Sequence, residues 1–200
     1  MTEQWYYAAA GAAAGLIAAV VLGRTAAAVR RWWAGVPTAA AHFSPKGGCT
    51  AAVVAELAAA RSEVLVQAYS FTCPDIAAAL VAAAGRGVRV CVLLDRSNEE
   101  ETYSELGALE GRGIELRIDA SHAIAHNKVM VIDGRTVLTG SFNFTRQAEH
   151  ENAENLLVLR NHRALAARYR ANFHAHREHC HAPGEVTLKP AAHRPGRQAA

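Results

Sequence analysis

Cysteine is scarce in this 200-residue sequence, with only Cys49, Cys73, Cys91 and Cys180, and no two of them form a C-x-x-C pair. That spacing excludes a zinc ribbon and a thioredoxin-like redox site, since both need closely spaced pairs. An excess of charge of one sign is also lacking, because the formal net charge is only +3, while 51% of the residues are hydrophobic. The composition therefore excludes a disordered chain and predicts one globular domain with an appendage.

Charged residues are absent from the run Trp5–Gly23, WYYAAAGAAAGLIAAVVLG. About 20 apolar residues cross a bilayer as a helix, so this run predicts a transmembrane helix. Arg24, Arg30 and Arg31 follow it, and the positive-inside tendency then places the rest of the chain in the cytoplasm as a single-pass membrane protein. A cleaved signal peptide, which would give a secreted or periplasmic protein, is the alternative, although only Glu3 is charged before the run.

Four regions follow from these changes in composition. Residues 1–33 are the predicted membrane anchor, and residues 34–45 a linker whose glycine and prolines discourage helix. A catalytic domain is expected at 42–182, followed by a disordered basic tail at 183–200. Residues 160–200 contain eight Lys or Arg against two Glu, which indicates either contact with nucleic acid or anionic lipid, or a solvated basic surface.

Helical and strand patterns alternate through the domain. Helices are expected at 50–62, 73–87 (with Thr72 as its cap), 98–113 and 161–179, and strands at 63–71, 88–95, 114–118, 128–132, 136–140 and 154–159. The predicted fold class is therefore α/β, with a mixed β-sheet flanked by helices.

Two polar side chains open an apolar strand in the sequence HNKVMVID. Alternate residues of a strand face the same side, so a strand that starts at His126 would project His126 and Lys128 together. The same parity pairs Ser141 with Asn143 at the end of the next strand, and a hairpin would bring the two pairs together. Asp133 has the opposite parity and opens the turn, which predicts a structural role. Lysine charge, hydroxyl and amide donors and a nucleophilic histidine suit a phosphate.

With these residues the sequence resembles the phospholipase D (HKD) superfamily of phosphodiesterases. The matching motif is His126-x-Lys128-(x)4-Asp133, then Gly140-Ser141-x-Asn143 and Glu154 at the family spacing. AYSFTCPDI, GVRVCVLLD, GSFNFT and ENAENLLVL are similar to stretches of the small bacterial phospholipase-D-like endonucleases, over residues 43–176. The mitochondrial cardiolipin hydrolase (Zucchini) branch is a more distant resemblance. Its cysteine-rich insertion is missing here, so its zinc site is not expected.

The resemblance implies a role for each matching residue. His126 would attack phosphorus to form a phosphohistidine, while Lys128 and Asn143 hold the phosphoryl oxygens with Ser141 close by. Glu154 would bind the second imidazole nitrogen and so fix the orientation of the ring.

A single copy of the motif is present, and the sequence has no internal repeat. The family's chemistry uses two histidines, so the resemblance implies a homodimer with a shared active site, in which His126 of each subunit takes part. The two imidazoles would titrate as a coupled pair. No cofactor or metal is expected, since a two-metal hydrolase would need a convergent set of acidic ligands.

Other residues lie near the motif or carry ligand chemistry of their own. Lys46 and Arg96 are in loops that would border the site and bind substrate. His122, four residues before His126, is expected either near the substrate or as an exposed loop histidine. The segment HAHREHCH at 174–181 suits a divalent metal or adventitious metal binding.

The sequence is compatible with three functions. The leading one is an endonuclease that cleaves DNA or RNA without metal, and the alternative is a phospholipase D that acts on phosphatidylcholine- or cardiolipin-type lipid. The third is an inactive module that binds nucleic acid or lipid. Nucleic acid and lipid both present a phosphodiester, so the motif by itself does not separate them.

Overall fold

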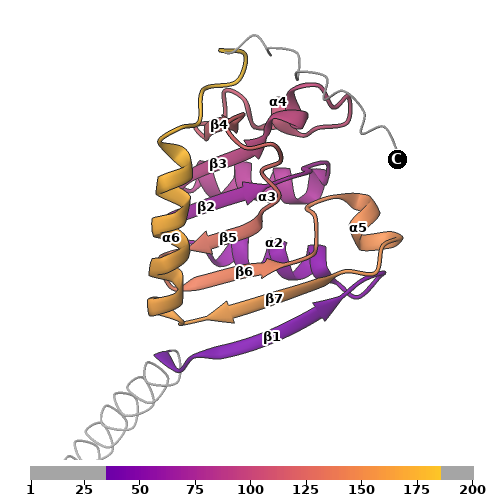
Figure 1. Ribbon diagram of the computed structural model, residues 1–200. Helices are drawn as coiled ribbons and strands as arrows, with labels where there is room; N and C mark the ends of the chain where they lie inside the picture. Colours follow the sequence, from indigo (N-terminus) through magenta and orange to yellow (C-terminus); the bar gives the residue numbers. More distant parts are fainter. Residues whose placement is uncertain (1–34, 186–200) are drawn as a thin grey trace, which may run out of the picture. The chain divides into compact units, whose positions relative to one another are not determined.

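The computed structural model describes residues 35–185, in which seven strands form one mixed sheet. The strands are β1 (Thr38–Phe43), β2 (Glu63–Ala68), β3 (Arg89–Asp95), β4 (Glu115–Asp119), β5 (Lys128–Ile132), β6 (Thr136–Gly140) and β7 (Asn155–Arg160). Their order across the sheet is β1-β7-β6-β5-β2-β3-β4 (Figure 1). Strands β2, β3 and β4 are mutually parallel, whereas β5, β6 and β7 continue the sheet from β2 in antiparallel pairs.

Helices cover both faces of this sheet. They are α2 (Cys49–Ala59), α3 (Pro74–Gly85), α4 (Leu106–Leu109), α5 (Arg146–His150) and α6 (Arg163–Arg177), with a 3₁₀ turn, η1, at Arg96–Glu99. Helices α2 and α3 lie behind the sheet in Figure 1, and α6 crosses its front. This arrangement confirms the predicted mixed sheet flanked by helices.

Strand β2 is buried along its whole length because helices cover both of its faces. Its alternate side chains belong to two separate cores. Val64 and Val66 pack with the side chains of α2 and α3, whereas Leu65 packs with Phe173 of α6. The period of two in the strand therefore sets which layer each residue joins.

The hairpin between β5 and β6 has the turn that the sequence predicts. Asp133 and Gly134 have φ of 52° and 61°, and the Arg135 N–H donates to the Ile132 carbonyl at 3.1 Å. Two central residues with positive φ define a type I′ turn, which matches the twist of antiparallel strands.

Three sequence predictions about elements need correction. The helix expected at 98–113 is only η1 and α4, because the Asn98 amide donates to the Tyr69 and Asp95 carbonyls and the Glu105 N–H donates to the Phe71 carbonyl. Helix α3 is capped at Cys73 rather than Thr72, since Pro74 fixes its first turn. The predicted linker at 34–45 contains β1, which is an outermost strand of the sheet and lies beside β7.

The predicted anchor, residues 1–33, lies outside the described residues, as does all but the start of the predicted tail at 183–200. Within residues 35–185 no helix is both long and apolar enough to cross a membrane. The chain forms two compact units, residues 1–38 and residues 39–200.

Candidate active site

His126 lies in the loop immediately before β5, which spans Lys128–Ile132 as predicted, so the strand does not begin at His126 as the parity argument supposed. Its side chain is exposed, and its ring packs at 4.6 Å between centroids from the ring of Tyr69. Tyr69 follows β2, the neighbour of β5, and its N–H donates to the Asn127 carbonyl at 3.0 Å. The loop that carries His126 is therefore fixed to the end of β2.

Lys128 is the first residue of β5 and is only 7% exposed. Its Nζ donates to the His126 carbonyl at 2.9 Å and lies 4.9 Å from the centroid of the Tyr69 ring. Burial lowers the pKa of Lys128 below its ordinary value, and the nearby negative charge of Glu154 opposes part of that effect. A cation is thus held beside His126 with Tyr69 as a shared packing partner.

Ser141 and Asn143 follow the last residue of β6, Gly140, so they lie at the end of this strand as predicted. Val129 pairs with Thr139, and Gly140 pairs with Leu156. The start of β5, the end of β6 and the start of β7 therefore lie along the same edge of the sheet, the one formed by strand ends. The sheet register therefore places the segments of His126, Lys128, Ser141, Asn143 and Glu154 at that edge.

Asn143 and Ser141 differ in their hydrogen bonds. The Oδ1 atom of Asn143 is buried and has no hydrogen-bond partner among the described residues. A buried acceptor without a partner costs free energy and needs a donor, so any contact of Asn143 with a phosphoryl oxygen would be made by its amide N–H groups. Ser141 Oγ instead accepts from the N–H and side-chain amide of Asn155, both at 3.1 Å.

Glu154 lies next to β7 and is held by its neighbours. Its Oε1 accepts from the Asn152 amide at 3.2 Å, its N–H donates to Ser44 Oγ at 3.2 Å, and its carbonyl accepts from the Ser44 N–H at 3.1 Å. The family resemblance implied a hydrogen bond from this carboxylate to His126, but within residues 35–185 the structure has none. Glu154 nevertheless lies near enough to Lys128 to oppose part of the lowering of that lysine's pKa by burial.

Asp133 lies at the opposite end of β5 from His126 and contacts the α2–β2 loop. Its carboxylate accepts from the N–H groups of Arg61, Ser62 and Glu63 and from Ser62 Oγ, at 2.8 to 3.2 Å. These contacts support the structural role that strand parity predicts for this residue.

The three residues expected at the rim have different surroundings. Lys46 is exposed in the loop after Ser44, and its N–H donates to the Glu149 carbonyl. Arg96 Nη2 donates to the Ala123 carbonyl at 3.3 Å, so it braces the loop that leads to His126. The ring of His122 is directed to Asp119 at 2.9 Å, not to His126.

Sequence reasoning missed two carboxylates that support the site. Asp95, buried at the end of β3, accepts from the Ala125 N–H at 2.7 Å and so anchors the residue before His126. Glu149 accepts from the N–H groups of Gly48 and Thr50 at the start of α2. An acidic residue that ends a buried apolar strand was the available signal for Asp95, whereas Glu149 contacts residues about 100 positions away and has no local signal.

Known proteins are similar to this chain in sequence and in fold. Residues 53–177 match the family described as "Cardiolipin synthase, PLD-like domain". The chain is 45% identical over 117 residues to a phospholipase D of Rickettsia bellii, which covers 58% of each chain. It is 38% identical over 105 residues to the mitochondrial cardiolipin hydrolase of Xenopus tropicalis, covering 52% of this chain and 50% of that one. The chain thus spans about half to three fifths of the length of these relatives.

A solved structure agrees over nearly all of its own length. Nuc of Salmonella typhimurium, a phospholipase D family member, is 36% identical with a TM-score of 0.71, covering 74% of this chain and 98% of that chain. NucT of Helicobacter pylori, at 24% identity and a TM-score of 0.68, shows the same fold. Since the family match covers more than half of the chain and includes the histidine, lysine and asparagine at the sheet edge, this chain belongs to the phospholipase D-like family.

Proposed function

We propose that this protein is a phosphodiesterase that forms a phosphohistidine at His126, with nucleic acid, DNA or RNA, as its substrate. The observation that carries the proposal is the placement of an exposed imidazole beside the buried Lys128 cation at the edge that also holds Asn143. The resemblance of AYSFTCPDI, GVRVCVLLD and GSFNFT to the small bacterial phospholipase-D-like endonucleases favours a nuclease. Nuc, a phospholipase D family member, matches this chain over 98% of its own length.

The proposed chemistry proceeds in two displacements. In the first, a His126 ring nitrogen attacks phosphorus, a P–N bond forms, and the P–O bond to the leaving group breaks. His126 of the partner subunit donates a proton to the leaving oxygen. In the second, that imidazole takes a proton from water, which attacks phosphorus and releases the first imidazole. Lys128 and the Asn143 amide would bind the phosphoryl oxygens, and no step needs a metal ion.

Two exposed apolar side chains lie near this site and support a subunit interface there. Ile124, two residues before His126, is 58% exposed, and Phe43, next to the Ser44 that binds Glu154, is 63% exposed. Large apolar side chains near a site that needs a second histidine are suited to a subunit interface. The homodimer with a shared active site is therefore part of the proposal.

A phospholipid substrate is the second candidate. It is favoured by relatives named phospholipase D and mitochondrial cardiolipin hydrolase, and by the uncharged run at 5–23, which as an anchor would keep the domain on the cytoplasmic surface of a membrane. An inactive binding module is the third, and the catalytic residue set argues against it.

The deciding experiment compares substrates under one condition. The full-length protein, purified in mild detergent with excess EDTA, would be incubated with single-stranded DNA, double-stranded DNA, RNA, cardiolipin and phosphatidylcholine. We expect cleavage of nucleic acid by the wild type and none by H126A. Cleavage of lipid alone would establish the second candidate, and cleavage of neither, with or without magnesium, would leave the binding module.

A further inference from the structure

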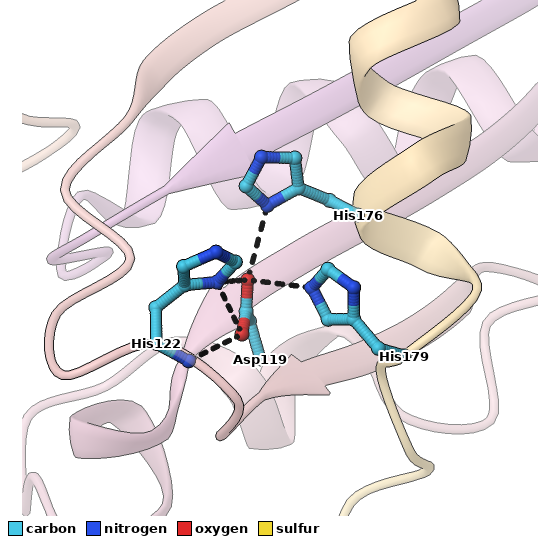
Figure 2. A group of neighbouring side chains, drawn as sticks. All are labelled: Asp119, His122, His176 and His179. Carbon is cyan, nitrogen blue, oxygen red and sulfur yellow. Dashed lines mark hydrogen bonds and ion pairs between the residues drawn. The ribbon is translucent and has the colours of Figure 1, made fainter.

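Three histidines surround one buried carboxylate at the end of β4, an outermost strand of the sheet. Asp119 is the last residue of β4, and His122 is in the loop that follows. His176 lies in the last turn of α6, and His179 comes just after that helix. Figure 2 shows the three rings pointing toward the Asp119 carboxylate from two segments about 57 residues apart in sequence. One nitrogen or oxygen from each residue lies within 4.8 Å of the others.

The distances in this cluster suit a tetrahedral metal ion. Asp119 Oδ2 lies 2.9 Å from His122 Nδ1, 3.2 Å from His176 Nδ1 and 3.4 Å from His179 Nε2. Ligand atoms about 2.0–2.1 Å from a tetrahedrally coordinated zinc ion are separated from one another by about 3.3 Å. The four side chains therefore need only small rotations to surround such an ion.

Hydrogen bonding by itself accounts poorly for the same arrangement. A carboxylate oxygen has two lone pairs, yet three imidazole nitrogens converge on Oδ2. The other oxygen, Oδ1, already accepts from the N–H groups of Ser121 and His122, and His122 Nδ1 also lies 3.1 Å from it. The rings also lie close together, with centroids 4.9 to 5.4 Å apart. A metal ion that accepts one lone pair from each imidazole removes the need for three donors at one oxygen.

We propose that Asp119, His122, His176 and His179 form a structural site for a divalent transition-metal ion, zinc above all. Imidazole and carboxylate are ligands that suit zinc, cobalt and nickel. Four protein ligands complete a tetrahedral shell, which is typical of structural sites, whereas catalytic zinc sites keep one position open for water. The inference goes beyond the proposed function, in which the ion takes no part.

The site would join the end of α6 to β4 and to the loop before β5. The chain after α6 already pairs with β4, because the backbones of Ile118 and His181 exchange hydrogen bonds at 2.8 and 3.1 Å. Asp95 holds the later part of the same loop through the Ala125 N–H. A metal ion at His122 would fix its first part, so that both ends of the segment leading to His126 are held.

Metal binding can be measured on the full-length protein without any substrate. After removal of metal with EDTA and dialysis, the protein would be titrated with Co²⁺ and then with Zn²⁺. We expect one Co²⁺ per chain with the strong visible absorption of a tetrahedral site, loss of that absorption when Zn²⁺ is added, and a melting temperature that rises with Zn²⁺ concentration.

Histidine variants distinguish metal binding at this cluster from metal binding at other histidines. H176Q/H179Q should lose both the Co²⁺ spectrum and the Zn²⁺-dependent rise in melting temperature. H122Q, which changes a loop side chain that is 46% exposed, should lose the tetrahedral spectrum without endangering the fold. The matched control H150Q/H174Q removes two histidines outside the cluster and should bind as the wild type does.

Two results would overturn the proposed site. One is stoichiometric binding by H176Q/H179Q and H122Q with the wild-type spectrum, and the other is no stoichiometric binding by the wild type. Cleavage assays report on a separate question. Loss of cleavage when metal is removed would leave the binding result unchanged, since a released His126 loop and a metal-dependent reaction would both abolish cleavage.

Discussion

Lys128 shows at the scale of a single residue how the fold prepares a charge for phosphate. Its ammonium group is nearly excluded from water and is contacted by the His126 carbonyl and the Tyr69 ring. A cation that has few waters of its own interacts more strongly with an anionic oxygen than an exposed one does. The negative charge of Glu154 offsets part of the cost of burying this cation.

Glu154→Gln tests whether this carboxylate serves the proposed reaction. We expect kcat to fall about 10²- to 10⁴-fold, since the family resemblance implies that this carboxylate orients the catalytic imidazole during the reaction. Folding should be unchanged, because the backbone contacts of Glu154 with Ser44 remain. Steady-state kinetics with circular dichroism would check both, with the exposed neighbour Glu151→Gln as control. Unchanged turnover in folded E154Q would remove Glu154 from the site.

Asp133→Asn should affect stability. Burial would raise the pKa of Asp133, but hydrogen bonds from Ser62, Glu63 and Arg61 outweigh it and hold the pKa below the usual value of 3.8. The ionised carboxylate therefore stabilises the fold above pH 3.8, and this contribution is lost as the pH falls through the lower, folded-state pKa. At neutral pH we expect D133N to lower the free energy of unfolding by about 1–3 kcal/mol.

Urea titrations of D133N and wild type across acidic and neutral pH would measure this difference. The two curves should converge toward low pH, because protonated Asp133 and Asn are then similar. Glu110→Gln, at an exposed position, serves as the control. A difference that stays constant with pH would contradict the role of the ionised carboxylate.

At the scale of elements, α6 connects the second core to the histidine cluster. Phe173 is 1% exposed and packs on Leu65, Cys91 and Leu93 of the sheet, one turn before His176. The helix therefore both closes the front core and positions two of the proposed metal ligands.

Phe173→Ala should destabilise the protein by about 3–5 kcal/mol, since it leaves a cavity under α6. The proposed metal affinity should weaken as well, because His176 lies in the last turn of this helix and His179 comes just after it. Asn172→Ala, one residue away and exposed, should change neither quantity by much. Urea unfolding and Co²⁺ titration would measure both effects, and wild-type stability in F173A would show that α6 is not packed as described.

At the scale of the whole molecule, one chain provides one copy of the motif. If His126 from two subunits makes one reaction centre, a dimer of one wild-type and one H126A subunit should be nearly inactive, because members of a catalytic unit fail together. In mixtures that pair at random, activity should then fall as the square of the wild-type fraction. Activity measured over a series of co-expression ratios would test this, and a linear fall would indicate independent sites.

The sequence by itself determined the repeated alternation of helices and strands and the motif that ends in Asn143 and Glu154. Local patterns suffice for these features, since strand burial, the Asp133-Gly134 turn and the motif spacing are all properties of neighbouring residues. The same reasoning failed for the helix expected at 98–113, because contacts from Asn98 and Glu105 to the end of β2 and the residues after it override its helical pattern.

Only the tertiary structure decided which distant residues meet. Asp119 and His176 have no relation in sequence, and their contact exists because β4 and the end of α6 lie side by side. The support of the His126 loop by Asp95 and the packing of Tyr69 against both His126 and Lys128 likewise follow from the order β5-β2-β3 in the sheet. Strand order is a global choice among packings, so no local pattern records it.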